Sequence, residues 1–349
     1  MVRRHHGRQG LPARPAPHDP AVSGAPGLVG PPDVVLGTAV ADDVAGYQAF
    51  TRRAAELGYG RVWLTETYKL DPVTFAGWAA TALPGHPLGL GVVPAPLRSG
   101  PQLAMIASTL AGLGVEDLEV LVGASSAAMT RGWHGRGVAT MAAMEALVAS
   151  ARAAASGERT PGGFTNGLGP APLRLGLAAF GPKMLRLAGR VADRVVLNMV
   201  APAVVPSFLA EIAEGASAAG RPAPPVTVWA HVALDPSEQT VAAARRFVSG
   251  YIRVPGYDRA FAAQGFGAVV EAARAAASTR EVRGLVPDEL LVEVLGLGDL
   301  STLRARLDAY REAGAHPALV PSVVADPGAV RTLAALAPEA GEGRGAAAS

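Results

Sequence analysis

Residues 34–66 read VVLGTAVADDVAGYQAFTRRAAELGYGRVWLTE and contain one complete strand–helix–strand unit. The apolar run VVLGTAV at 34–40 predicts a short buried strand. The next segment, 42–60, starts with aspartate, ends with glycine and is amphipathic between them, which is the pattern of a capped helix. RVWLTE at 61–66 predicts a second strand. A strand that follows a helix so closely is typical of a parallel sheet.

The same alternation continues to the end of the chain. Further strands are predicted at 88–95, 117–124, 173–180, 194–200, 225–234 and 317–323. Further helices are predicted at 71–83, 102–113, 141–155, 182–192, 204–220, 238–252, 300–314 and 328–336. The strands are apolar along their whole length, which indicates a parallel sheet covered on both faces. This α/β pattern predicts a (β/α)8 TIM barrel with a helical insertion at 254–298 after the seventh strand. A doubly wound sheet is the alternative.

Composition narrows the classes of function. The 349-residue chain is half apolar, yet no run reaches the roughly 18 uncharged apolar residues that a membrane span needs. It contains no cysteine, so disulfides and thiolate metal sites are excluded. Residues 1–32 hold four arginines and one aspartate, a charge of +3, and the whole chain carries +2, which leaves −1 for the remainder. A near-neutral remainder has no basic face for nucleic acid. We expect a cytoplasmic protein that binds neither nucleic acid nor membrane.

The two ends differ in composition from the rest. Residues 1–32 are rich in Pro, Gly, Ala and Arg and lack the apolar segment of a secretory signal. We expect this tail, and the tail at 339–349, to be disordered. The predicted barrel domain is then 33–338.

Two turns that follow strands have the residues that bind anions. GASSAAMTRGWHG at 123–135 offers consecutive backbone N–H groups and two hydroxyls with little side-chain bulk, which suits a phosphate. A glycine-rich turn without a ligand is the alternative. The Gly-Pro-Lys turn at 181–183 also opens a helix after a strand, and Lys183 is one of only two lysines, with Lys69.

The sequence shows no catalytic triad, no histidine spacing for a metal, no P-loop and no Rossmann fingerprint. A phosphate site in an apolar barrel without nucleophile or metal ligands indicates a bound cofactor that performs the reaction.

Five stretches carry a family resemblance, namely residues 54–66, 88–113, 118–135, 178–198 and 303–315. Together they are similar to the luciferase-like monooxygenase family, and within it to the bacterial coenzyme F420-dependent reductases and dehydrogenases. The likeness covers roughly residues 34–338, and the family fold is a TIM barrel, which agrees with the strand–helix pattern above.

The resemblance implies a site at the carboxyl ends of the strands. Gly91 and Val92 match a bulge behind the deazaflavin ring, where relatives carry a non-prolyl cis peptide bond. The segments that match the phosphate side of the cofactor, F420 or alternatively FMN, are Gly123, Ala124, Ser125 and Ser126, and Ala179, Phe180, Gly181, Pro182 and Lys183. Asn198, at the end of the sixth strand, is a further candidate cofactor-binding residue.

The sequence departs from the family after the second strand. Relatives commonly have an acid followed by histidine there, whereas this chain has Glu66 followed by Thr67. Threonine has no useful pKa, so the proton donor must be another group, such as Glu66, Tyr68, Lys69 or His134. We take Glu66, Thr67 and His134 as candidate catalytic residues. Because reduction of an activated C=C or C=N bond demands less of a base than alcohol oxidation, we favour a reductase.

The candidate substrate-contacting residues are Tyr68, Lys69, Trp133, His231 and Tyr257. For Trp133 and Tyr257 packing within the protein is the alternative, and for His231 it is a hydrogen bond inside the barrel. Arg98 and Arg131 are candidates to reach the phosphate or the acidic tail of F420, and Phe261 lies with Tyr257 in the insertion.

Three functions follow from these observations. The first is an F420H2-dependent reductase of a small molecule or peptide natural product, with a dehydroamino acid or an imine as the reduced group. The second is an FMN-dependent monooxygenase of the same family. The third is a relative that binds a ligand without redox chemistry. The absence of the family histidine after the second strand suggests this third function. Relatives frequently form homodimers, which we also expect here.

Overall fold

The structure of the chain is a computed structural model that describes residues 30–37 and 39–339. The tails predicted at 1–32 and 339–349 therefore lie almost wholly outside the described residues.

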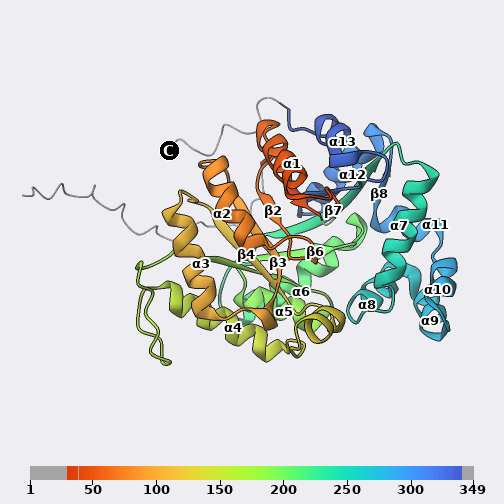
Figure 1. Cartoon of the computed structure of the whole chain (residues 1–349). Coiled ribbons are helices and arrows are strands. Elements are labelled where there is room, and N and C mark those ends of the chain that lie inside the picture. The colour runs from red at the N-terminus through yellow and green to blue at the C-terminus, as the bar shows by residue number, and fades with distance from the viewer. Residues whose placement is uncertain (1–29, 38, 340–349) are drawn as a thin grey trace, which may run out of the picture.

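Eight parallel strands close into a barrel at the centre of the molecule (Figure 1). Each strand pairs with the next in chain order, and the last, β9, pairs with both β7 and β1. The strands are β1 (Asp33–Leu36), β2 (Val62–Leu64), β3 (Leu88–Pro94), β4 (Leu118–Gly123), β5 (Arg174–Ala178), β6 (Arg194–Asn198), β7 (Val226–Leu234) and β9 (His316–Pro321). The predicted TIM barrel is confirmed, and most strands end one to four residues earlier than predicted. Several candidate site residues consequently lie in loops rather than on strands.

Helices cover the outside of the barrel. They are α1 (Val44–Glu56), α2 (Pro72–Ala82), α3 (Gly100–Gly112), α4 (Met141–Ala155), α5 (Pro182–Val191), α6 (Val205–Ala218), α12 (Leu300–Glu312) and α13 (Val330–Ala335). Their starts are set by the sequence, since the side chains of Asp43, Asp71, Ser99, Thr140 and Asp299 each accept a hydrogen bond from a free backbone N–H of the first turn. A π-helical turn, Ala128–Trp133, occupies the segment after β4 and was not predicted.

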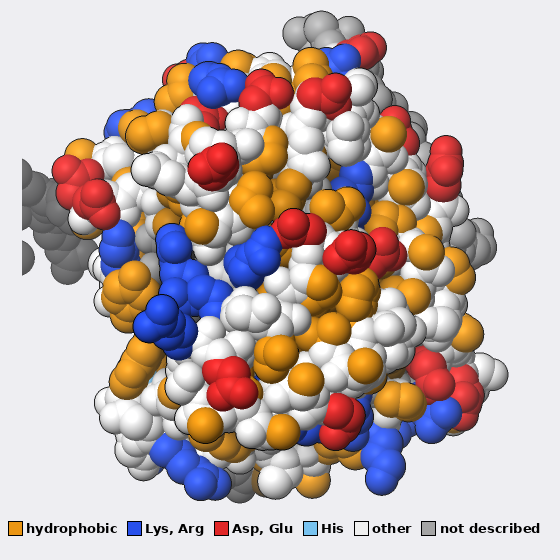
Figure 2. All heavy atoms as spheres, turned by 90° about the vertical axis from the view of Figure 1, so that its right-hand side faces the viewer, with side chains coloured by type: hydrophobic (Ala, Val, Ile, Leu, Met, Phe, Trp, Pro, Cys, Tyr) orange, Lys and Arg blue, Asp and Glu red, His pale blue; other side chains and the backbone are white. Residues whose placement is uncertain are grey.

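The predicted insertion after the seventh strand is present and forms a cluster of its own at the right of Figure 1. It begins earlier than the predicted residue 254, because the helix predicted at 238–252 packs with it rather than with the barrel. It consists of α7 (Glu238–Tyr251), α8 (Tyr257–Phe261), α9 (Gly267–Ala275), α10 (Thr279–Leu285), α11 (Asp288–Val294) and a short extra strand, β8 (Gly296–Gly298), on β7. Val248 and Ile252 at the end of α7 pack with Phe261 and Val270 in a core separate from that of the barrel. On this side apolar side chains spread over the centre, with basic groups gathered to the left (Figure 2).

The barrel interior is layered. Inward side chains of the middle layer include Val35, Trp63, Leu121, Val196 and Ala318. Trp63 fits because its neighbour on β3 is Gly89, where a Cβ atom would come within 2.1 Å of the indole ring. The middle layer is thus filled by side chains, as TIM-barrel interiors are.

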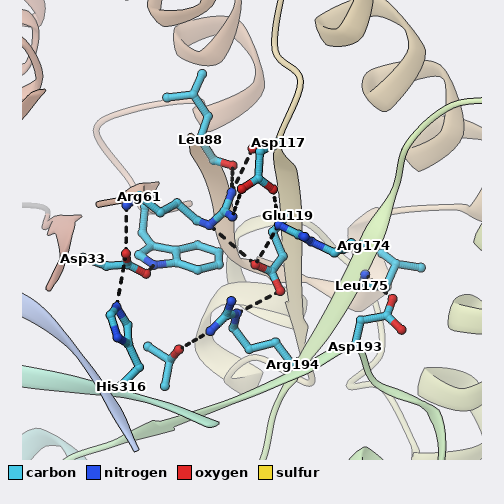
Figure 3. Close-up of polar contacts among 12 residues, drawn as sticks. Asp33, Arg61, Leu88, Asp117, Glu119, Arg174, Leu175, Asp193, Arg194 and His316 are labelled. Atoms are coloured by element: carbon cyan, nitrogen blue, oxygen red, sulfur yellow. Dashed lines mark hydrogen bonds and ion pairs between the residues drawn. The ribbon is translucent and has the colours of Figure 1, made fainter. Parts of the chain in front are cut away.

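A polar network closes the amino-terminal end of the barrel (Figure 3). The Glu119 carboxylate is 1% exposed and forms ion pairs with two arginines. Arg194 Nε lies 2.8 Å from Oε1, and Arg61 Nε lies 3.5 Å from Oε2. Arg61 is also paired with Asp117 at 2.7 Å, and Asp33 lies 3.3 Å from His316. A cavity of about 200 Å³ lies beside these groups. In a TIM barrel this end serves stability, and the opposite end carries the chemistry.

Candidate functional site

The inward residues at the carboxyl ends of the strands are mostly small. Side chains two residues apart on a strand point to the same side of the sheet. Gly37, Gly123 and Ala178 each lie two residues beyond the middle layer on their strands, so they face the mouth of the barrel. Val92 and Val320 are partly buried there above the middle layer. The side chains at positions 37, 123 and 178 are smaller than those of the layer beneath, such as Trp63 and Leu121.

Strand β3 is irregular where it reaches the mouth. The Gly91–Val92 peptide bond is cis, as the family resemblance implied, and the pairing with β4 shifts register between Leu90 and Val93. The neighbouring strand passes very close, because a Cβ atom on Gly123 would lie 2.6 Å from Val92 Cγ1. Val92 and Gly123 are therefore in contact, and the binding of a cofactor by residues 91, 92 and 123 stays a prediction.

The segment after β4 is held by its own hydroxyl groups. Ser125 has a left-handed backbone with φ of 63°, and its Oγ donates to Met129 Sδ at 3.1 Å. Ser126 Oγ accepts from the Met129 N–H at 3.3 Å. Ala124 is partly exposed beside them. Both serine side chains thus have partners within the segment, and their contact with a phosphate stays a prediction.

Glu66 is paired with a buried cation. Its carboxylate lies 2.6 Å from Arg98 Nη2, and the Arg98 side chain is only 9% exposed. Burial raises the pKa of Glu66, and the charges of Arg98 and His134 offset part of that rise. Arg98 thus forms an ion pair with Glu66, and its contact with the cofactor stays a prediction.

The loop after β2 is tied to the loop after β1. Lys69 Nζ donates to Ala41 O at 3.1 Å and lies 3.0 Å from Asp42 Oδ1. The hydrogen bond to Asp42 raises the pKa of Lys69. Thr67 Oγ1 is 3.5 Å from the Lys69 N–H. The ammonium predicted to contact substrate is thus occupied in fixing this loop.

Two exposed aromatic side chains stand at the same end. Tyr68 and Trp133 are 71% and 57% exposed, and their rings meet edge to face with centroids 6.4 Å apart. His134 follows Trp133, is exposed, and is near enough to affect Glu66 electrostatically. The structure therefore brings Glu66, Tyr68, Trp133 and His134 together, although they come from two different loops.

The turn after β5 joins the barrel to the insertion. Gly181 has a φ of 73° and precedes α5, whose first turn carries the exposed Pro182 and Lys183. Ala179 is buried, and the Phe180 ring packs on Tyr257 with centroids 4.3 Å apart. The two predicted groups, cofactor turn and insertion aromatics, are in contact.

Asn198, at the end of β6, connects two predicted substrate residues. Its Oδ1 lies 2.8 Å from His231 Nε2, and its Nδ2 donates to Tyr257 Oη at 2.8 Å. His231 is half-buried, and burial lowers its pKa to about 4. Burial likewise raises the pKa of Tyr257. His231 therefore has the hydrogen bond within the barrel that was the alternative to substrate contact, and both ends of the Asn198 amide are occupied.

Some residues of this site were not identified from the sequence. Phe247 lies against His231 and Tyr251, at centroid distances of 4.9 and 5.1 Å, and Tyr251 lies 4.8 Å from Tyr257. The amino-acid composition could have pointed to this aromatic group, because five of the 14 phenylalanines and tyrosines fall between 247 and 266. Trp229 is directed into the barrel beneath His231, and its buried Nε1 has no hydrogen-bond partner among the described residues. No sequence signal pointed to it.

Two searches of the described residues complete the description of the site. They contain no group of three or more His, Asp or Glu side chains placed to hold a metal ion. None of their helices has both the length and the apolar character needed to cross a membrane.

Comparison with known proteins identifies the family and the fold. A family model for luciferase-like monooxygenases matches residues 12–317. The coenzyme F420-dependent tetrahydromethanopterin reductase of Methanopyrus kandleri has a similar structure, with a TM-score of 0.69 and 17% identity over 88% of this chain and 98% of that one. An F420-dependent secondary alcohol dehydrogenase in complex with an F420–acetone adduct also has a similar structure. The TM-score is 0.73, and the identity is 16% over 91% of this chain and 100% of that one.

A third similar structure contains a flavin. It is the oxygenating constituent of 3,6-diketocamphane monooxygenase from Pseudomonas putida in complex with FMN, with a TM-score of 0.61 and 15% identity over 89% of this chain and 98% of that one. At such identities the structural likenesses establish the fold alone. A comparison with curated proteins finds no match.

Proposed function

The chain belongs to the luciferase-like monooxygenase family, and from this premise we propose that it is an oxidoreductase that uses reduced coenzyme F420. The acceptor is an activated C=C or C=N bond in a small molecule or specialised metabolite, of the dehydroamino-acid or imine type. When bound, reduced F420 supplies a hydride from its deazaflavin ring.

The observation that carries the proposal is the small-residue mouth of the barrel. Gly37, Val92, Gly123 and Ala178 provide a floor for a planar ring, and a Cβ atom on Gly123 would collide with Val92. Phe180 and Tyr257 stand as an aromatic wall beside this floor. Apolar walls with few polar groups are typical of cofactor sites.

The phosphate of the cofactor has a candidate partner in Lys183. This lysine is exposed on the first turn of α5, and among the described residues it forms no hydrogen bond or ion pair. The amino-terminal end of a ten-residue helix carries partial positive charge, so it favours an anion together with the ammonium.

On the substrate side, Glu66 is the candidate to hold a proton. Burial raises the pKa of Glu66, which favours the protonated form, and Arg98 keeps the carboxyl in place. Tyr68 and Trp133 present apolar faces on which an extended or aromatic substrate can pack.

An FMN-dependent monooxygenase is the second candidate, and the likeness to an FMN-bound structure over 89% of this chain supports it. A titration of the purified protein with F420 and with FMN, followed by fluorescence, separates the two. We expect F420 to bind at micromolar concentration and FMN at least tenfold more weakly. Binding of neither cofactor would leave a non-redox ligand-binding protein.

A pair of variants tests the placement of the cofactor. Lys183→Met should weaken F420 binding about tenfold, the effect of losing one charge-assisted hydrogen bond. Arg280→Met removes an exposed cation from α10, in the insertion, and should change the affinity less than twofold. Equal affinities for the two variants would remove Lys183 from the site.

A further inference from the structure

The side-chain amide of Asn198 lies between two groups, with Oδ1 toward His231 and Nδ2 toward Tyr257. Its Oδ1 can only accept a hydrogen bond, so the proton at this contact belongs to His231 Nε2, 2.8 Å away. Its Nδ2 can only donate, so Tyr257 Oη is the acceptor at the other contact, also 2.8 Å long.

This arrangement leaves the proton of the Tyr257 hydroxyl unused. The oxygen already accepts from Asn198, and no acceptor for its proton exists among the described residues. An O–H whose oxygen accepts one hydrogen bond is polarised and becomes a better donor for the next. Tyr257 can therefore donate to a molecule that enters the site.

The position of the three residues fits that role. Asn198 ends β6, and His231 points inward from β7 at the carboxyl end of the barrel. Tyr257 begins α8 and packs on Phe180, in the turn that follows β5. The hydroxyl thus belongs to the same aromatic wall that borders the proposed cofactor site.

We propose that Tyr257 is a catalytic residue that donates a hydrogen bond to an acceptor atom of the substrate, an imine nitrogen or a carbonyl oxygen. Asn198 and His231 are positioning residues that keep this donor available. The assignment rests on the proposed function, because it presumes a substrate that reaches the mouth of the barrel.

His231 decides which end of the amide faces Tyr257. The Nε2–H group of His231 holds Oδ1 on its own side, which leaves Nδ2 for the tyrosine. Without that donor the amide can turn around, and Oδ1 would then accept the proton of Tyr257. The tyrosine would be satisfied within the protein and lost to the substrate.

The network keeps one protonation state over a wide pH range. Burial raises the pKa of Tyr257, so the phenol stays protonated, and Tyr251, 4.8 Å away, is its titratable neighbour and reinforces this. The ring of His231 packs on the uncharged Phe247, and its pKa of about 4 keeps it neutral at pH 7.

The experiment uses protein loaded with oxidised F420 and labelled with 13C at tyrosine Cζ, whose resonance reports hydrogen bonding by the hydroxyl. The Tyr257 signal is assigned by its loss in Tyr257→Phe. The probes are 1-pyrroline, the smallest cyclic imine, and cyclopentene, which has the same shape without an acceptor. We expect 1-pyrroline to move the Tyr257 signal and cyclopentene to leave it in place.

Matched variants then test the positioning. Tyr257→Phe should weaken 1-pyrroline binding about tenfold. Tyr59→Phe, which removes a hydroxyl that donates to Leu333 O away from this site, should change it less than twofold. His231→Gln retains an N–H donor and should keep the signal shift. His231→Leu should abolish it, and so should Asn198→Asp, because a carboxylate would accept the tyrosine proton.

Two results would overturn the assignment: no shift with 1-pyrroline in the wild type, or an equal shift in His231→Leu. Nitrogen NMR of the histidine rings gives a readout without any ligand, since it must show His231 protonated at Nε2 and bare at Nδ1. F420 binding by the wild type is measured separately by fluorescence. Its absence would reject the proposed function, whereas normal binding without acceptor discrimination would reject only the role of Tyr257.

Discussion

Gly123 shows how strongly a single position depends on having no side chain. The close approach of β4 to Val92 leaves no room for a methyl group. We expect Gly123→Ala to lower the free energy of unfolding by about 1–3 kcal/mol, the usual cost of overpacking, and to weaken cofactor binding, because Val92 must move.

The control for this substitution lies nine residues further along the same segment. A Cβ atom on Gly132 would meet nothing within 4 Å, so Gly132→Ala should leave both stability and binding unchanged. Urea unfolding and a fluorescence titration of each variant decide the matter. A similar loss in both variants would show that the segment, rather than the contact with Val92, is sensitive.

His231 makes stability depend on pH in a predictable direction. Its pKa is about 4 in the folded protein and about 6.5 in an unfolded chain. Between these values the unfolded state binds more protons, so stability falls as pH is lowered from about 6.5 towards 4. Integration of that difference gives a loss of about 2 kcal/mol between pH 7 and pH 5.

Replacement of the titrating group isolates this contribution. Between pH 7 and pH 5, the free energy of unfolding measured in urea should fall by about 2 kcal/mol less for His231→Gln than for the wild type. The exposed His134→Gln should follow the wild type. A His231→Gln protein as acid-sensitive as the wild type would contradict the buried, neutral state of this ring.

At the scale of elements, helices α5 and α6 pack through two glycines. A Cβ atom on Gly189 would lie 2.0 Å from Ile212 O, and one on Gly215 would lie 2.0 Å from Arg186 O. Because both obstacles are backbone atoms, the helices must separate to admit a methyl group. Gly189→Ala should cost about 2 kcal/mol, more than the roughly 1 kcal/mol that alanine gains in helix propensity.

A second helical glycine provides the comparison. Gly112, at the end of α3, has open space around its Cα, so Gly112→Ala should stabilise by up to about 1 kcal/mol. Thermal unfolding of the two variants should therefore move in opposite directions. A rise for both would mean that α5 and α6 adjust freely.

Elements were predictable where local signals were strong. The helix Met141–Ala155 was predicted to the residue, since Thr140 caps it and its apolar residues recur at helical spacing. The π-helical turn Ala128–Trp133 was not, because its polar, glycine-containing segment has no periodicity. The contacts of Asn198 with residues 33 and 59 positions away depend on barrel closure, which no local pattern encodes.

At the scale of the whole molecule, the two ends of the barrel have different tasks. The amino-terminal end is fixed by charges, with Glu119 between Arg61 and Arg194. Glu119→Gln leaves two buried guanidinium groups without their shared counter-charge. We expect a loss of about 3–5 kcal/mol in urea unfolding, and F420 affinity within twofold of the wild type where the variant is folded.

An exposed ion pair is the matched control for this network. Glu145 pairs with Arg190 on the surface at 3.2 Å, with both side chains well exposed. Glu145→Gln should therefore cost less than about 1 kcal/mol. If both substitutions cost the same, burial does not determine the strength of the network.

Tyr257 belongs to a segment that the closed sheet does not require. The eight barrel strands pair in a complete ring without α8, so this stretch can be lengthened, shortened or exchanged while the ring stays intact. The barrel scaffold and the residue proposed to select the substrate therefore lie in parts of the chain that can change separately. Grafting residues 254–298 onto a related barrel, together with asparagine and histidine at the positions of Asn198 and His231, should transfer preference for acceptor-bearing compounds.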